Sequence, residues 1–141
     1  MALKRSFIRA LLVLSLALLC AAADGSWMKQ VPAADRAQAN PFQHDREKDA
    51  VSAGAKLYSY NCAQCHGDNA QGRGKRPGLR TYRIQHQATD GDLFWLLRNG
   101  NIYHGMPSWN AKLTSEARWQ IVAYIKSLGP APGATASGSG K

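Results

Sequence analysis

Five consecutive residues, Cys62-Ala63-Gln64-Cys65-His66, restrict what this 141-residue chain can fold around more than any other feature. They fit the C-x-x-C-H pattern of covalent attachment of a c-type haem. Cysteines three positions apart on a helical turn share one face, so each can add to one of two neighbouring vinyl groups of a porphyrin. The histidine that follows can hold a ring nitrogen over the iron as an axial ligand. The motif therefore predicts a haem within the fold.

Three other uses of the same cysteines are weaker. A thioredoxin-like redox pair belongs near a βαβ pattern, and no alternating strand pattern is visible in the sequence. A structural zinc site needs a second ligand pair at comparable spacing, whereas His44, His86 and His104 are scattered. A structural disulfide between the two cysteines gives no role to the adjacent histidine.

The first 23 residues have the pattern of a cleaved secretory signal. Three basic residues precede an apolar run over 10–19, and three alanines at 21–23 suit a signal peptidase. Ten apolar residues are too few to span a bilayer, which takes about 20. We therefore expect export from the cytoplasm and no stable membrane anchor. Export agrees with the haem motif, because covalent haem attachment takes place outside the cytoplasm. An uncleaved anchor and a lipid on Cys20 are the alternatives.

The composition limits the remaining classes. The chain is 45% hydrophobic and 19% charged, which is typical of a globular protein, and three cysteines are too few for a disulfide scaffold. Its formal net charge is +9, and loss of the three basic residues of the leader lowers this to +6. Nothing in the sequence resembles a nucleic-acid-binding module, so we expect no nucleic-acid partner.

The chain divides by composition into an arm, a domain and a tail. Residues 24–48 are polar, contain two prolines and show no periodicity, which predicts an extended arm that packs loosely. Residues 129–141 are mostly Gly, Pro, Ala and Ser, which is typical of a flexible tail. The domain between them, 49–128, is about 80 residues long and is marginal for an unaided hydrophobic core.

Apolar residues at helical spacing predict three helices and no strand. These are expected at about 47–60, at about 90–98 and from Thr114 to residue 128. The loops between them, 67–89 and 99–113, are long for so small a domain and need something to pack against. The pattern therefore favours an all-α domain with a prosthetic group in its core.

Residue types at the helix ends support these boundaries. Thr89 and Asp92 form a capping-box pattern before the second helix, and Gly100 suits its end. Thr114 can cap the third helix.

Over about residues 49–128 the chain resembles a class I, monohaem c-type cytochrome of the bacterial periplasmic kind. Members of that family carry a glycine and an aromatic residue eight and four positions before the first haem cysteine, where the first and last helices cross. Here these positions hold Gly54 and Tyr58, and Tyr124 is a natural partner on the last helix. The resemblance implies a small cytochrome c fold, with three to four helices and long loops wrapped around one covalent haem c.

The resemblance also implies a second axial ligand. Met106 lies 40 residues after His66 within Gly105-Met106-Pro107-Ser108-Trp109, the kind of loop in which the family places its axial methionine. A thioether favours ferrous iron and raises the reduction potential relative to a second histidine. His104 is the rival ligand, and simple loop packing is the other role open to Met106.

The supporting residues follow from the same resemblance. Pro77 resembles the family's proline whose carbonyl accepts a hydrogen bond from the proximal histidine, which orients the ring. Several large apolar side chains would line the haem, although ordinary core packing is an equal alternative for them: Leu79, Leu93, Trp95, Leu96 and Trp109.

A basic stretch runs from Gly72 to Arg83. It forms either a positive rim that steers an acidic redox partner, a set of contacts to the haem propionates, or a solvated loop. Its charged members are Arg73, Lys75, Arg76, Arg80 and Arg83.

The function implied is that of a monomeric periplasmic electron carrier, with iron ligated by His66 and Met106 and no catalytic residues. The segment at Asn40-Pro41 resembles that of cytochromes which accept electrons from quinoprotein dehydrogenases, and a further cytochrome or an oxidase would be the acceptor. Two alternatives stay open. One is a haem enzyme subunit or gas sensor with an open sixth position, and the other is a tightly bound subunit of a dehydrogenase complex.

Overall fold

The computed structural model describes residues 26–135, so the expected leader and the last six residues lie outside the described residues. The chain divides into two units, 1–30 and 31–141. Within the described residues, the first unit contributes only the 3-10 helix η2 (Ser26–Gln30). The elements described below belong to the second unit.

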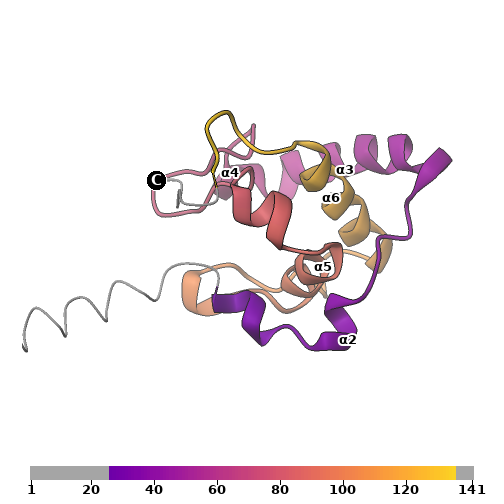
Figure 1. Ribbon diagram of the computed structural model, residues 1–141, viewed down its shortest axis with the longest axis horizontal. Helices are drawn as coiled ribbons and strands as arrows, with labels where there is room; N and C mark the ends of the chain where they lie inside the picture. The colour runs from indigo at the N-terminus through magenta and orange to yellow at the C-terminus, as the bar shows by residue number, and fades with distance from the viewer. Residues whose placement is uncertain (1–25, 136–141) are drawn as a thin grey trace, which may run out of the picture. The chain divides into compact units, whose positions relative to one another are not determined.

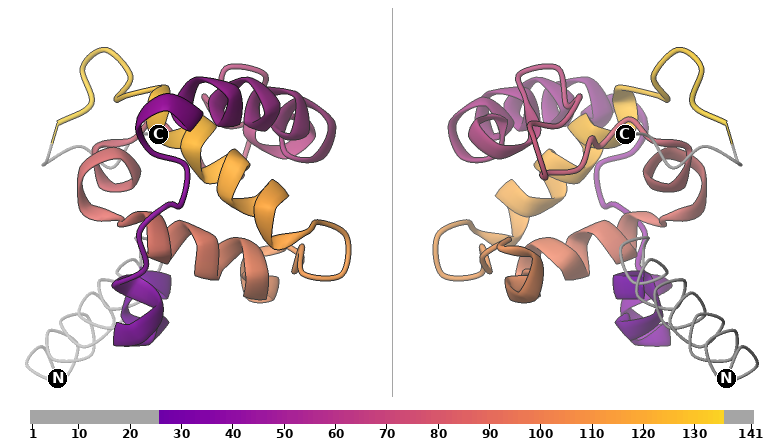
Figure 2. Two further views of the ribbon diagram at one scale, coloured as in Figure 1. Left: turned by 90° about the vertical axis from the view of Figure 1, so that its right-hand side faces the viewer. Right: turned by 90° about the vertical axis from the view of Figure 1, so that its left-hand side faces the viewer.

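Three helices form the framework of this unit: α3 (Glu47–Asn61), α5 (Asp90–Asn99) and α6 (Ser115–Ser127). Helix α6 packs against both α3 and α5 (Figures 1 and 2). The described residues contain no β-strand, only two isolated bridges. The predictions of an all-α fold and of three main helices are confirmed, with helix ends within a few residues of those expected.

The crossing of α3 and α6 depends on Gly54. A Cβ atom added at this glycine would overlap the backbone carbonyl of Gln120 and lie 2.9 Å from the Tyr124 Cβ. One turn further on, the Tyr58 and Tyr124 rings meet with centroids 5.2 Å apart. The glycine therefore permits the close approach, and the aromatic pair fills the space beside it, as predicted.

The contact between α5 and α6 is built on stacked aromatic rings. Phe94 and Trp119 lie nearly parallel, with centroids 4.0 Å apart. The buried apolar residues around them come from both helices: Leu93, Leu97, Ile121, Val122 and Ile125.

The predicted caps are present. Thr89 Oγ1 accepts from the Asp92 amide, and Asp92 Oδ2 accepts from the Thr89 amide, which completes the capping box of α5. Gly100 lies just after this helix with φ 75°. Thr114 Oγ1 accepts from the Ala117 amide at the start of α6.

Both long loops contain short helices. The first carries the π-helix η4 (Arg83–Gln87), and the second carries the 3-10 helix η5 (Ile102–His104). The Lys126 amine of α6 holds the end of η4, since it donates to the carbonyls of Ile84, Gln85 and Ala88.

The arm differs from the extended, loosely packed segment that the sequence predicts over 24–48. It contains α2 (Ala33–Arg36) and η3 (His44–Arg46). Arg36 Nε lies 2.8 Å from Asp92 Oδ1, and the buried Asn40 donates to the Trp119 carbonyl at 3.0 Å. The physical reason is that the Asp92 carboxylate is buried and needs a charged partner, which α2 supplies.

The beginning of the expected tail is also attached to the domain. The Ala131 amide donates to the Arg80 carbonyl at 2.8 Å, and Arg80 Nε donates to the Gly129 carbonyl at 3.3 Å. Residues 129–131 are therefore held by the loop that precedes η4.

Candidate functional site

The three motif residues lie together at the end of α3 and on the short helix α4 (Ala63–His66), which follows it directly. Cys62 is the N-cap of α4, and its carbonyl accepts from the amides of Cys65 and His66 at 3.1 and 2.9 Å. One helical turn thus holds both sulfurs and the imidazole. Tyr58 fixes the far end of this turn, because its hydroxyl donates to the Gly67 carbonyl at 2.8 Å.

Cys62 and Cys65 form no disulfide, so neither sulfur is used in a structural bridge. Cys62 is buried and Cys65 is exposed. Burial, with a smaller contribution from neighbouring Cys65, raises the pKa of Cys62 to about 12, so that its sulfur is protonated at neutral pH.

The His66 ring is oriented by Pro77. His66 Nδ1 lies 2.8 Å from the Pro77 carbonyl oxygen. Because a carbonyl can only accept, the proton of a neutral ring is on Nδ1, which leaves the Nε2 lone pair for a metal. Burial lowers the pKa of His66, opposed by the Pro77 hydrogen bond, and the Arg76 charge lowers it further. These effects favour the neutral ring that metal ligation requires.

The loop after His66 folds back on itself to bring Pro77 into place. The Gly72 amide donates to the His66 carbonyl at 2.7 Å, and the Leu79 amide donates to the Ala70 carbonyl at 2.8 Å. The proline carbonyl therefore belongs to a hydrogen-bonded loop rather than to a freely moving one.

Met106 lies in a closed turn on the other long loop. The backbone of Asn101 exchanges two hydrogen bonds with Met106, at 2.8 and 3.0 Å. The next residues are fixed to α5, since Ser108 Oγ donates to the Arg98 carbonyl and the Trp109 amide donates to the Leu97 carbonyl. The turn therefore gives Met106 a defined backbone position.

The rival ligand His104 lies in the same turn as Met106. Its ring is exposed, and Nδ1 lies 2.9 Å from the Asn101 Oδ1. This contact uses only Nδ1, as the contact of His66 does, so it leaves ligation through Nε2 open; Met106 differs from His104 in being half-buried.

The predicted apolar lining divides into two groups. Leu93 is buried in the packing of α5, so it belongs to the helical core. The other four side chains are only half-buried: Leu79, Trp95, Leu96 and Trp109. Large apolar side chains that protein covers only in part are suited to covering a further apolar group. Together with a free imidazole lone pair and two thiols, they fit a haem.

The donor set does not fit a structural zinc site. Among the described residues, no three His, Cys, Asp or Glu side chains are grouped as a metal cluster would require. The absence of strands from the same part of the chain also removes the βαβ setting of a thioredoxin-like pair.

The basic stretch is partly bound to the protein. Arg73 pairs with Asp68 at 2.9 Å on the surface, and Arg80 contacts Gly129. Arg76 Nη1 donates to the His104 carbonyl at 2.6 Å. The stretch is therefore not simply a solvated loop.

One buried charged residue, Arg118, was not identified from the sequence. It is only 6% exposed, and its Nη1 donates to the Leu113 carbonyl at 2.8 Å and to the Asn110 carbonyl at 3.3 Å. Its guanidinium lies 5.2 Å from the centre of the Phe94 ring. A basic residue in the first turn of a helix ordinarily faces solvent, so no sequence signal marks it as a support for the loop after Met106.

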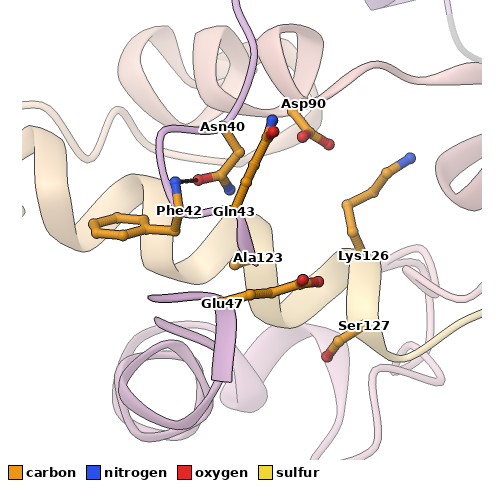
Figure 3. Close-up of a pocket in the computed structure, with 8 residues that line it drawn as sticks. All are labelled: Asn40, Phe42, Gln43, Glu47, Asp90, Ala123, Lys126 and Ser127. Atoms are coloured by element: carbon orange, nitrogen blue, oxygen red, sulfur yellow. Dashed lines mark hydrogen bonds between the residues drawn. The ribbon is translucent and has the colours of Figure 1, made fainter. Parts of the chain in front are cut away.

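A small polar pocket of about 190 Å³ lies among the 40–47 segment, the start of α5 and the end of α6 (Figure 3). Figure 3 shows the Lys126 side chain directed away from Glu47, and its amine is occupied by the carbonyls at the end of η4. None of the predicted haem-site residues lines this pocket.

No helix within residues 26–135 combines the length and the apolar character needed to cross a bilayer.

Comparison with known proteins agrees with this geometry. The FixP subunit of the cbb3-type cytochrome c oxidase of Sinorhizobium medicae is 36% identical over 100 residues, which cover 59% of this chain and 32% of that protein. Cytochrome c550 of Pseudomonas aeruginosa is 32% identical over 98 residues, covering 63% and 64%. Quinohemoprotein alcohol dehydrogenase ADH-IIG of Pseudomonas putida is 40% identical over 77 residues, covering 54% and 10%. The chain thus spans between a tenth and two thirds of these relatives.

A solved structure shares the fold. Cytochrome cL from the marine methylotrophic bacterium Methylophaga aminisulfidivorans superposes with a TM-score of 0.56 at 28% identity, covering 64% of this chain and 59% of that one. Residues 49–125 also match the family described as cytochrome c oxidase, cbb3-type, subunit III, and the cytochrome c relationship implies covalent haem c. The chain therefore belongs to that family and carries a monohaem cytochrome c domain homologous to cytochrome c550 and cytochrome cL.

Proposed function

We propose that this protein is a periplasmic electron carrier that transfers single electrons through one covalently bound haem c. The observation that carries the proposal is the 2.8 Å contact between His66 Nδ1 and the Pro77 carbonyl, on the same turn as two free thiols. The contact leaves the other imidazole nitrogen for iron, and the two sulfurs on the same turn supply the covalent attachment. The exported location rests on the leader-like composition of residues 1–23.

Each site residue has a defined role in this proposal. Cys62 and Cys65 hold the haem covalently, and His66 and Met106 are the axial ligands. The haem supplies a one-electron ferric/ferrous couple when bound. With both axial positions filled, no position is open for a substrate, so the protein needs no acid–base residues and is not an enzyme.

The partners are proposed from the relatives. The likeness to a quinohemoprotein alcohol dehydrogenase supports a quinoprotein-type dehydrogenase as the electron donor. The likeness to cbb3-type oxidase subunits supports an oxidase or a further cytochrome as the acceptor. The positive net charge of this chain favours partners with acidic docking surfaces. We propose that the carrier itself is a monomer.

An absorption spectrum of the haem-loaded protein, oxidised and then reduced, tests the closed coordination. We expect a low-spin c-type spectrum with a Met-to-iron charge-transfer band, and no change when carbon monoxide is added to the reduced form. A high-spin spectrum that shifts with carbon monoxide would instead indicate a gas sensor or a haem enzyme subunit.

A second candidate is a tightly bound electron-transfer subunit. It is favoured by the relatives in which this domain forms only a tenth or a third of a larger protein. Purification from the native source at high salt separates the two. A free carrier should elute alone, because salt screens electrostatic contacts, whereas a subunit should elute with its dehydrogenase.

A further inference from the structure

The side chain of Arg76 connects the two loops that carry the proposed axial ligands. Its Nη1 donates to the His104 carbonyl at 2.6 Å, across 28 residues of sequence. Arg76 directly precedes Pro77, which orients His66, and His104 is two residues before Met106. One side chain therefore joins the support of the first ligand to the turn of the second.

Both ends of this connection are fixed. On one side, the backbones of Arg73 and Arg76 exchange hydrogen bonds at 2.9 and 3.2 Å, which closes a tight turn. On the other side, the turn from Asn101 to Met106 is closed by two backbone hydrogen bonds. A hydrogen bond between two closed turns restrains both, whereas the same bond to a free loop would restrain neither.

Gly105 shows that the guanidinium also packs against the methionine turn. This glycine has φ 73°, in the left-handed region. A Cβ atom here would lie 2.5 Å from Arg76 Nη1 and 3.2 Å from Arg76 Cζ. The planar group therefore lies directly against the glycine backbone, so this contact uses the shape of arginine as well as its charge.

We propose that Arg76 is a positioning residue that holds the Met106 turn in its ligating position, and that it is not a free docking charge. The proposal rests on the closed His66/Met106 coordination of the proposed function. It assigns a separate task to one member of the basic stretch. Arg73 instead pairs with Asp68 on the surface, and Lys75 is exposed.

The test is the binding of imidazole to the ferric, haem-loaded full chain, because imidazole binds iron only where Met106 leaves it. Arg76→Met keeps an unbranched side chain, shorter than that of arginine, and removes its donors. Lys75→Gln is the neighbouring control that also loses one positive charge. Because this charge-assisted hydrogen bond lies at the surface, its loss should raise the imidazole affinity of Arg76→Met by roughly three- to ten-fold. Lys75→Gln should bind imidazole as the parent protein does. Arg76→Lys keeps a charged donor but not the planar group, so its imidazole affinity should lie between those of Arg76→Met and Lys75→Gln. It serves as the test if Arg76→Met does not load haem.

The outcomes separate the two proposals. If the parent protein lacks the Met-to-iron band, the closed coordination is wrong and the positioning role fails with it. If the parent shows the band and Arg76→Met binds imidazole no better than Lys75→Gln does, only the role of Arg76 is overturned. A changed reduction potential with unchanged imidazole affinity in Arg76→Met would also overturn it, and would indicate a contact to a propionate.

Discussion

Gly54 has a strict local requirement, because it meets the backbone of α6 rather than a flexible side chain. A methyl group there would strike the Gln120 carbonyl, which cannot turn aside without moving the helix. The position is therefore sensitive to the smallest enlargement that an amino acid allows.

We predict that Gly54→Ala lowers the free energy of unfolding by about 1–3 kcal/mol, because the overpacked crossing outweighs the better helix propensity of alanine. Urea unfolding of the haem-loaded protein measures this. Ser52→Ala, on the exposed face of the same helix, is the control and should change stability little. Equal stability of the parent and Gly54→Ala would show that the helices can separate at no cost.

The proposed coordination makes Met106 the residue that sets the chemistry of the iron. Met106→Ala should lower the reduction potential and allow carbon monoxide to bind the reduced protein, because a thioether stabilises ferrous iron and blocks its sixth position. Potentiometry and a carbon monoxide titration check both effects. Met28→Ala, which removes the one other methionine outside the expected leader, is the matched control, and His104→Ala tests the rival ligand. An unchanged potential in Met106→Ala would exclude this residue as a ligand.

Among the elements, the joint between α3 and α4 combines stability with the placement of the motif. The Tyr58 hydroxyl is buried and donates to the Gly67 carbonyl, one residue after His66. Burial, with smaller contributions from neighbouring charges, raises the pKa of Tyr58 well above its ordinary value. The folded protein therefore holds this proton more strongly than the unfolded chain does.

This shift predicts a stability loss at alkaline pH that Tyr58→Phe should remove. Below pH 10 the tyrosine is protonated in both states, so its contribution is complete. Above about pH 10 the unfolded chain loses the proton first, and stability falls by up to about 1.4 kcal/mol per pH unit. Tyr58→Phe should cost about 1–2 kcal/mol at pH 7. The gap in urea-unfolding stability between parent and variant should then narrow from pH 9 to pH 11, and a constant gap would contradict the role of this group.

The elements also show how far sequence reasoning reaches. The three main helices, their caps and the turn bearing the motif follow from local patterns, because apolar spacing and capping residues act over a few positions. Local patterns could not predict the contacts of three residues: Asn40, Arg118 and Arg76. Their partners lie 28 or more residues away, or are backbone carbonyls, which every residue carries and which leave no trace in the sequence.

At the scale of the whole molecule, the excess of basic over acidic residues creates a field that acts on any charged redox partner before contact. The structure assigns part of the basic stretch to internal contacts. Arg80 is tied to Gly129, and Arg76 to the methionine turn. We therefore predict that any steering by this stretch comes mainly from exposed Lys75 and from Arg73, whose pairing with Asp68 is exposed and weak.

Oxidation of the ferrous protein by ferricyanide, a trianion, tests this assignment without a natural partner. At low ionic strength, the double substitution Arg73→Gln/Lys75→Gln should slow oxidation by about three-fold or more, because attraction acts over roughly 30 Å at 0.01 M salt. At 1 M salt the range falls to about 3 Å, and the rates of variant and parent should converge. The control Lys48→Gln/Lys56→Gln removes the same charge from exposed positions on α3. If both double variants slow oxidation equally, net charge alone governs the encounter. Only a larger decrease in rate on substitution of residues 73 and 75 would place the docking surface at the basic stretch, beside the haem loops.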